Sequence, residues 1–216
     1  MKTENATGAS LNQTAYDIIL QQIMDRKLGG GTIIQERKVA TELGISRTPM
    51  RMALARLEGE AFLTRLSERL LAVRTVSLPE CLDAIGIRKL IEPEATRLAT
   101  PRIELSVLED LKGQLSKLMT RKKADLRMEW EFDDRLHQTI AKYSGNLAMV
   151  DTVARLRRTT RLFVHLKVAE PSSLSHGGNE HLKIIEAMAS RDAEEAARAM
   201  YVHLDNSCEG ILNKLH

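Results

Sequence analysis

Aromatic residues and cysteines are scarce in this chain of 216 residues. Phe, Trp and Tyr together make up 3% of it, although 43% of the residues are hydrophobic. The core must therefore consist mainly of Leu, Ile, Val, Met and Ala, which favours helices. The two cysteines, Cys81 and Cys208, are isolated and give no disulfide framework, which suits a reducing cytoplasm. We interpret both as ordinary buried thiols.

Long apolar runs, export signals and common catalytic motifs are also missing. No stretch approaches the roughly 18 apolar residues of a membrane span. Residues 1–10 are polar and lack the apolar region of a signal peptide, so we expect a disordered tail and a cytoplasmic protein. The glycines at 29–31 are not followed by the Gly-Lys-Ser/Thr of a phosphate loop. His-Glu-x-x-His and Gly-x-Ser-x-Gly motifs are absent too, which argues against an enzyme.

Charge is unevenly distributed along the chain. The formal net charge is +3. Residues 1–75 contain 11 Lys and Arg against 8 Asp and Glu, whereas the remaining residues contain 21 of each sign. The whole basic excess therefore lies in the N-terminal third, which favours a polyanionic partner there.

Residues 36–58 have the pattern of two short helices joined by a turn. Gly44 can adopt the positive φ that ends a helix, Ser46 is a suitable N-cap, and Pro49 falls in the first turn, where its missing N–H has no intrahelical partner. The second helix has one apolar face, formed by Met50, Ala53, Leu54 and Leu57. This arrangement fits either a DNA-reading helix-turn-helix or an amphipathic helix with a solvated polar face.

The residue string decides between these alternatives. Residues 36–51, Glu-Arg-Lys-Val-Ala-Thr-Glu-Leu-Gly-Ile-Ser-Arg-Thr-Pro-Met-Arg, strongly resemble the DNA-binding domain of GntR-family transcription regulators. The resemblance extends over about residues 15–74. It implies that operator DNA is contacted by one residue of the first helix, Arg37, and by four residues at the start of the second, Ser46, Arg47, Thr48 and Arg51.

Residues 61–74 alternate imperfectly between apolar and polar side chains. We interpret them as a small hairpin, the wing of a winged helix. Wings of the GntR family usually carry glycine at the tip, but residues 66–69 here are Leu-Ser-Glu-Arg. Insertion of this wing into the minor groove is therefore left open.

The chain beyond residue 76 is helical in pattern throughout. Ser77 and Glu80 form a capping box that marks its start, and Ser106 and Asp192 begin similar signatures. We expect helices at about 78–99, 105–122, 125–143, 147–169, 179–190 and 192–214. The predicted fold is mostly α, with a winged helix-turn-helix domain at 11–75 and a helical-bundle domain at 76–216. The second domain resembles the FCD ligand-binding domain of the FadR and VanR subfamilies, and six helices favour the VanR type.

One carboxylate and three imidazoles are expected to point into this helical core. Asp133 and His137 lie one turn apart on an apolar helix face, and His181 and His203 each lie on an apolar stripe. Each histidine could be a hydrogen-bonded core residue, but burying all four groups unpaired would be costly, and a divalent cation would remove that cost. The four residues match the metal motif of FCD domains, which implies bound Zn, Ni, Mn or Fe. His165, His176 and His216 match nothing in that motif.

Arg88 occupies the Arg-x-x-x-Glu position of the FCD family. It could bind the carboxylate of a ligand, or it could form a structural salt bridge with Glu92 one turn away. The resemblance implies a homodimeric repressor that binds double-stranded operator DNA and is controlled by a small carboxylate effector beside the metal. The alternatives are the same regulator with a purely structural metal and no effector, and a metal-dependent hydrolase.

Overall fold

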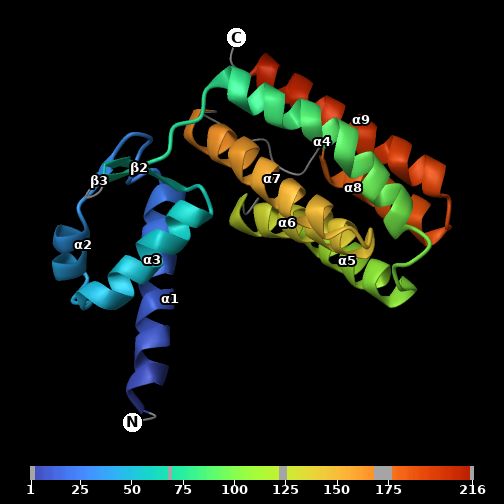
Figure 1. The fold of residues 1–216 in the computed structure, drawn as a ribbon. Helices are drawn as coiled ribbons and strands as arrows, with labels where there is room; N and C mark the ends of the chain where they lie inside the picture. The colour runs from blue at the N-terminus through green and yellow to red at the C-terminus, as the bar shows by residue number, and fades with distance from the viewer. Residues whose placement is uncertain (1–2, 68–69, 122–125, 168–176, 215–216) are drawn as a thin grey trace. The chain divides into compact units, whose positions relative to one another are not determined.

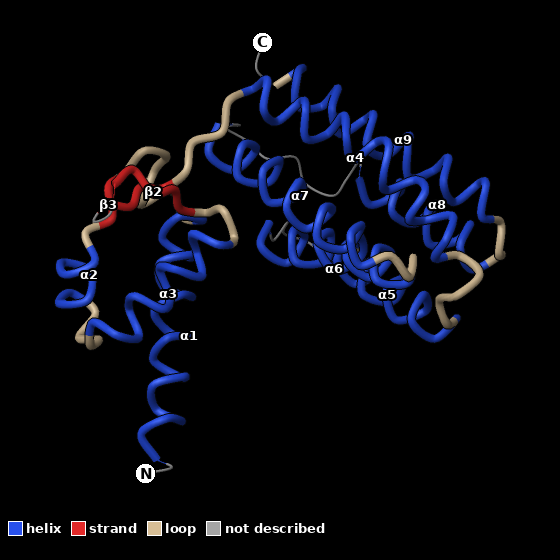
Figure 2. Tube along the Cα trace, in the orientation of Figure 1, coloured by secondary structure: helices blue, strands red, loops and turns tan. Residues whose placement is uncertain are grey.

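The computed structural model describes residues 3–67, 70–121, 126–167 and 177–214. Two compact units make up the chain, and each is considered by itself. One consists of residues 1–77 with 165–167, and the other of residues 78–164 and 168–216. Helices account for most of the ribbon, and the short strands all lie in the first unit (Figures 1 and 2).

The first unit combines three helices with a three-stranded antiparallel sheet. The strands lie in the order β1-β3-β2. The elements are α1 (Thr3–Met24), β1 (Ile33–Ile34), α2 (Glu36–Glu42), α3 (Arg47–Gly59), β2 (Leu63–Ser67) and β3 (Leu70–Val73). Helices α1 and α3 pack together and form the core of the unit. The apolar face predicted for α3 is confirmed, since Met50, Ala53, Leu54 and Leu57 are all buried.

Helix α1 corrects one expectation. We expected a disordered tail at 1–10, but α1 begins at Thr3. No proline interrupts residues 3–14, and Gly8 is their only glycine. The helical hydrogen bonds of the turns anchored in the core can therefore continue toward the N-terminus.

Strands β2 and β3 form the predicted hairpin. Leu63 pairs with Val73 and Thr64 with Ala72, and the register shifts between Arg65 and Ser67. Two residues of the glycine-free tip, Glu68 and Arg69, lie outside the described residues. The hairpin agrees with the expected wing.

The second unit is a bundle of helices. They are α4 (Leu78–Ala99), α5 (Leu105–Met119), α6 (Leu126–Tyr143), α7 (Leu147–Lys167, of which the last three residues group with the first unit), α8 (Gly177–Ala189) and α9 (Ala193–Asn213). Helix α9 packs against α4 and α8, α4 packs against α6, and α5 packs against α6 and α8. Their buried aliphatic side chains form one core, as the shortage of aromatic residues predicted.

Helix starts depend on local capping, and one of the expected cap signatures is not used. The Asp192 carboxylate accepts a hydrogen bond from the Glu195 backbone N–H at 2.9 Å, which confirms the cap of α9. Ser106 instead lies inside α5, because that helix already begins at Leu105 after the extended residue Glu104. Ser46 is the N-cap of α3 by position, but its hydroxyl makes no capping hydrogen bond. In the described part of the chain, no helix has both the length and the apolar character needed to cross a membrane.

Candidate metal centre and DNA-binding surface

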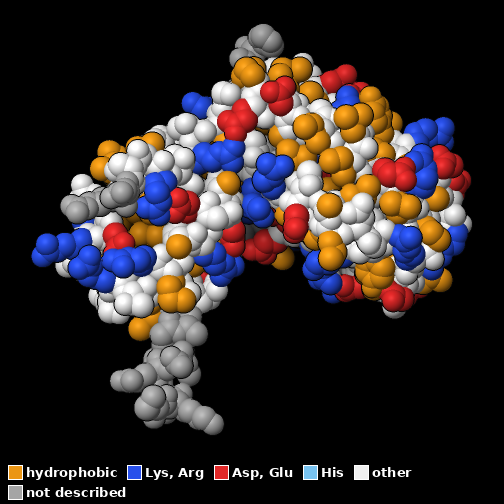
Figure 3. All heavy atoms as spheres, viewed as in Figure 1, with side chains coloured by type: hydrophobic (Ala, Val, Ile, Leu, Met, Phe, Trp, Pro, Cys, Tyr) orange, Lys and Arg blue, Asp and Glu red, His pale blue; other side chains and the backbone are white. Residues whose placement is uncertain are grey.

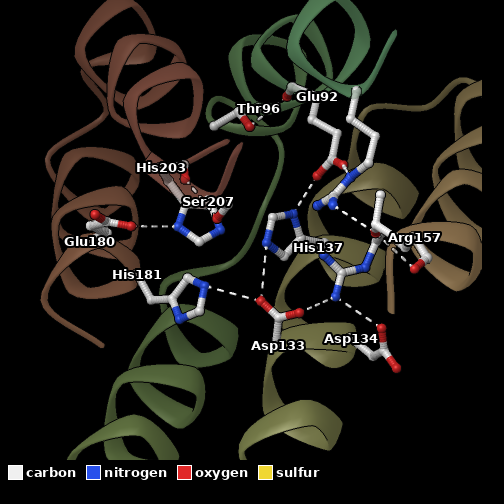
Figure 4. Close-up of polar contacts among 12 residues, drawn as sticks. Glu92, Thr96, Asp133, Asp134, His137, Arg157, Glu180, His181, His203 and Ser207 are labelled. Carbon is white, nitrogen blue, oxygen red and sulfur yellow. Dashed lines mark hydrogen bonds and ion pairs between the residues drawn. The ribbon is translucent and has the colours of Figure 1, made fainter. Parts of the chain in front are cut away.

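Three helices bring the four predicted metal ligands together. Helix α6 carries Asp133 and His137 one turn apart, α8 carries His181, and α9 carries His203. One potential ligand atom from each residue lies within 4.8 Å of the other three. The three imidazoles are buried, and all four side chains converge in the interior of the bundle (Figure 4). The i, i+4 spacing on α6 makes this convergence possible, because both side chains leave the helix on one face.

Several nitrogen atoms in this cluster lack a hydrogen-bond partner. Among the described residues, His137 Nε2 and both ring nitrogens of His181 are buried and unpaired. Asp133 Oδ1 lies 3.5 Å from His137 Nε2 and 3.2 Å from His181 Nε2. Leaving buried polar atoms unsatisfied costs about 1–3 kcal/mol each. Imidazole nitrogen and carboxylate oxygen are ordinary ligands of divalent transition metals, so the donor set fits such an ion.

Burial and neighbouring charge favour the protonation states that bind a metal. Burial lowers the pKa of His181, and burial together with the nearby His181 lowers the pKa of His203 to about 4. Burial alone would raise the pKa of Asp133, but the Arg157 guanidinium together with His137 and His181 outweighs it and holds that pKa well below its usual range. At neutral pH these two imidazoles are therefore neutral and the carboxylate is charged, as metal ligands must be.

A second layer of carboxylates and guanidinium groups surrounds the four residues. Glu92 Oε2 on α4 contacts His137 Nδ1, and Glu180 Oε2 on α8 lies 2.8 Å from His203 Nδ1. Arg157 on α7 donates hydrogen bonds to Asp133 Oδ2 at 2.5 Å and to Asp134 Oδ1 at 2.9 Å. Asp133 Oδ1 thus remains on the side of the imidazoles. Asp133, His137 and His203 thus each have a charged group on the side away from the cluster centre.

Arg88 lies in this second layer and forms the salt bridge considered in the sequence analysis. Its Nε donates to Glu92 Oε1 at 2.5 Å, and one terminal nitrogen donates to the Thr160 hydroxyl at 3.2 Å. Both charged side chains are buried. Through Glu92, the guanidinium is connected to His137.

Sequence reasoning missed Arg157 and the role of Glu180. Arg157 belongs to a basic segment of α7 in which several arginines look equivalent. Helical periodicity offers a signal, because Val153, Arg157 and Thr160 follow i, i+4, i+7 and are all buried. Of the histidines outside the cluster, His165 is buried, whereas His176 and His216 lie outside the described residues.

The candidate DNA-contacting residues lie on the exposed side of the helix-turn-helix. Gly44 has the positive φ of 63° that the turn requires. The side chains of Arg37, Ser46, Arg47, Thr48 and Arg51 are all exposed. Lys and Arg side chains gather on the face that carries α2 and α3 (Figure 3). The structure thus brings these residues onto one accessible surface, while the apolar face of α3 anchors the helix.

Arg51 and Arg47 share one acidic partner on that surface. Arg51 contacts Glu36 on α2 through Nε and a terminal nitrogen, at 3.3 and 3.2 Å. Arg47 Nε lies 3.8 Å from Glu36 Oε1. The carboxylate therefore links the start of α2 to the exposed face of α3, a contact that the sequence pattern did not predict.

Family models match both parts of the chain. Residues 11–72 match the model of bacterial regulatory proteins of the gntR family, and residues 83–206, more than half of the chain, match the FCD domain. The HTH-type transcriptional repressor RspR of Escherichia coli is 25% identical over 202 residues, which cover 93% of this chain and 89% of the relative. The Nta operon transcriptional regulator of Aminobacter aminovorans is 28% identical over 185 residues, covering 84% and 85% of the two chains.

Solved structures agree on the fold. Escherichia coli McbR/YncC aligns with a TM-score of 0.76 over 95% of this chain and 99% of its own, at 18% identity. The relatives are named as transcription regulators and not as enzymes, so the hydrolase alternative is set aside. The chain belongs to the GntR family of bacterial regulatory proteins, with an FCD effector-binding domain, and is a DNA-binding transcription regulator.

Proposed function

We propose that this regulator is a repressor whose operator binding is controlled by a small organic acid, bound beside a divalent metal ion in the FCD domain. The observation that carries the proposal is the convergence of Asp133, His137, His181 and His203, with buried ring nitrogens that have no hydrogen-bond partner among the described residues. The four residues would hold the ion. When bound, it would supply positive charge and coordination positions for a carboxylate oxygen.

The surroundings of the cluster support an anionic effector. Two buried guanidinium groups, those of Arg88 and Arg157, lie one contact away from the candidate ligands. We assign Arg88 to binding of the effector carboxylate, as a guanidinium can bind a carboxylate through two parallel hydrogen bonds. Its contact with Glu92 is then the arrangement of the ligand-free protein, and the effector competes with Glu92 for this guanidinium.

For the DNA-binding domain, we propose that the protein binds a pseudo-palindromic operator as a homodimer in the cytoplasm. Arg37, Ser46, Arg47, Thr48 and Arg51 contact the operator, and α3 enters the major groove. The two half-sites then lie about one helical turn, roughly 34 Å, apart. Effector binding changes the spacing of the two DNA-binding domains. For this it must favour one arrangement by a few kcal/mol.

The names of two relatives support the repressor assignment. One is the Escherichia coli repressor described above. The other is a probable D-xylose utilization operon transcriptional repressor of Paenarthrobacter nicotinovorans, which is 24% identical over 209 residues. We carry over only the sign of regulation from these names.

A thermal-shift screen tests the effector and the metal together. Small mono-, di- and hydroxycarboxylates are added to the full chain, either loaded with Zn²⁺ or stripped with a chelator. A ligand at 100 times its Kd adds about 2.7 kcal/mol of stability, which gives an easily measured rise in Tm. We expect at least one acid to stabilise only the metal-loaded form. If metal removal lowers the Tm but no acid shifts either form, the metal is structural and the effector proposal fails.

A further inference from the structure

The three imidazoles of the proposed metal centre differ in what holds their second nitrogen. His137 Nδ1 contacts Glu92 on α4, and His203 Nδ1 contacts Glu180 on α8. His181 has no such carboxylate behind it: among the described residues neither of its ring nitrogens forms a hydrogen bond, and Nε2 has only the 3.2 Å ion-pair contact with Asp133 Oδ1, itself a candidate ligand. Figure 4 shows the same difference: Glu92 lies beside His137 and Glu180 beside His203, whereas the dashed line from His181 leads to Asp133.

This difference determines which nitrogen faces the centre. A neutral imidazole carries one proton, and an ionised carboxylate at Nδ1 keeps the proton there. Nε2 then carries the free lone pair that a metal needs. The other oxygen of Glu92 is already occupied, because Arg88 Nε donates a hydrogen bond to Oε1 at 2.5 Å and leaves Oε2 for His137. His137 Nε2 is indeed the buried, unpaired nitrogen, on the side of Asp133.

Glu180 is itself held in place. Asn206 on α9 donates a hydrogen bond to Glu180 Oε1 at 2.6 Å, which leaves Oε2 for His203 at 2.8 Å. Asn206 and His203 lie three residues apart on one helix, so side chains on a single face of α9 contact both oxygens of the Glu180 carboxylate. The Glu180 side chain is only 20% exposed, so water competes weakly for this contact.

We propose that Glu92 and Glu180 are positioning residues of the metal centre, which set the tautomer of His137 and His203 before an ion binds, whereas His181 is oriented only when it coordinates the ion. This inference rests on the proposed metal site and adds which of its histidines are oriented before the ion binds. Of the three histidine ligands, two are preorganised and one is adjustable. Glu180 is the better residue to test, since Glu92 also neutralises the buried Arg88.

The first test measures Zn²⁺ affinity of the full chain by competition with a chromophoric chelator. Replacing the orienting carboxylate, Glu180→Ala, is expected to weaken Zn²⁺ binding by about 10- to 100-fold. Glu180→Gln keeps an acceptor oxygen and should recover most of that loss. Glu186→Ala is the matched control on α8, because this exposed carboxylate pairs with Lys112 at the surface, and it should bind Zn²⁺ like the unmodified protein.

The outcomes separate the inference from the metal site. Unchanged affinity in Glu180→Ala, together with lost binding in His203→Ala, overturns the positioning role and leaves the metal site intact. Unchanged affinity in both variants overturns the metal site itself. Equal losses in Glu180→Ala and Glu180→Gln also contradict the inference, because the acceptor oxygen would then not matter.

A second test reads the tautomers directly and needs no variant that might fail to fold. Long-range ¹⁵N–¹H spectra of the metal-free protein at neutral pH report which ring nitrogen carries the proton. We expect His137 and His203 to be protonated at Nδ1 and His181 to show averaging between both tautomers. A His203 ring protonated at Nε2, or averaged like His181, would overturn the proposal.

Discussion

Arg51 of α3 donates two hydrogen bonds to Glu36 of α2, at 3.2 and 3.3 Å, on the exposed face of the helix-turn-helix. The contact occupies the Nε edge of the guanidinium and leaves its other terminal nitrogen available. An exposed ion pair contributes little to stability, about 0–1 kcal/mol, but it restricts a long side chain that would otherwise be mobile. Glu36 therefore orients a residue that we propose to contact the operator.

Removing the Glu36 charge should lower DNA specificity. We expect Glu36→Gln to reduce the ratio of specific to non-specific affinity by about two- to fivefold, the size of an exposed ion pair. The variant loses the orientation of Arg51 and also a negative charge that repels phosphates. Fluorescence anisotropy at fixed salt measures this ratio with two duplexes. One is selected from a random pool by the unmodified protein, and the other is a scrambled version of it. Glu42→Gln, which removes the same charge from α2, is the control.

Removing either recognition arginine should weaken operator binding itself. Arg47→Ala and Arg51→Ala should each cost about 1–3 kcal/mol if the side chain reads a base. A residue that contacts only phosphate would weaken all sequences about equally and lower the salt dependence. Arg135→Ala removes one exposed positive charge from the second unit and should leave affinity unchanged. An Arg51→Ala variant with the same affinity as this control would refute the assignment.

Loss of a ligand should remove the metal and its stabilising effect. His181→Ala is expected to abolish stoichiometric metal binding, since it removes one of four donors. A metal present at 100 times its Kd contributes about 2.7 kcal/mol, so the Tm of the metal-loaded protein should fall as well. Elemental analysis after dialysis and differential scanning calorimetry measure the two effects. Lys183→Ala, an exposed change on α8, should retain the metal, and a full metal content in His181→Ala would disprove the ligand set.

The buried pair of Arg88 and Glu92 should contribute to stability even without a ligand. Arg88→Ala leaves the Glu92 carboxylate buried and uncompensated, which costs about 3–5 kcal/mol. Its neighbour Lys89 pairs with Asp205 near the surface, so Lys89→Ala should cost at most ~1 kcal/mol.

The single tryptophan, Trp130 on α6, allows this comparison to follow the second unit alone. Urea titration of the metal-free chain, monitored by its fluorescence, measures both variants. Equal midpoints for the two variants would show that Arg88 has no structural role and is reserved for ligand binding.

Local patterns in the sequence predicted most of the elements. The helices expected at 78–99 and 147–169 appear as α4 (Leu78–Ala99) and α7 (Leu147–Lys167), because apolar periodicity is a property of neighbouring residues. The same holds for the apolar face of α3. The start of α5 at Leu105 agrees with the helix expected at 105–122, but the extended residue Glu104 and not Ser106 is its N-cap. The disordered tail expected at residues 1–10 was wrong from Thr3 onward, because a polar composition does not prevent helix formation.

By itself, the sequence determined the residue types, their helical spacing and the resemblance to one family, and these were enough to predict the two-part architecture and the four clustered side chains. Only the tertiary structure decided the partners of those side chains. Glu92 and His137 are 45 residues apart, Glu180 and His203 are 23 apart, and Arg157 reaches Asp133 from another helix. Such contacts depend on how α4, α6, α7, α8 and α9 pack, and periodicity within a single helix carries no information about the side chains that a neighbouring helix presents.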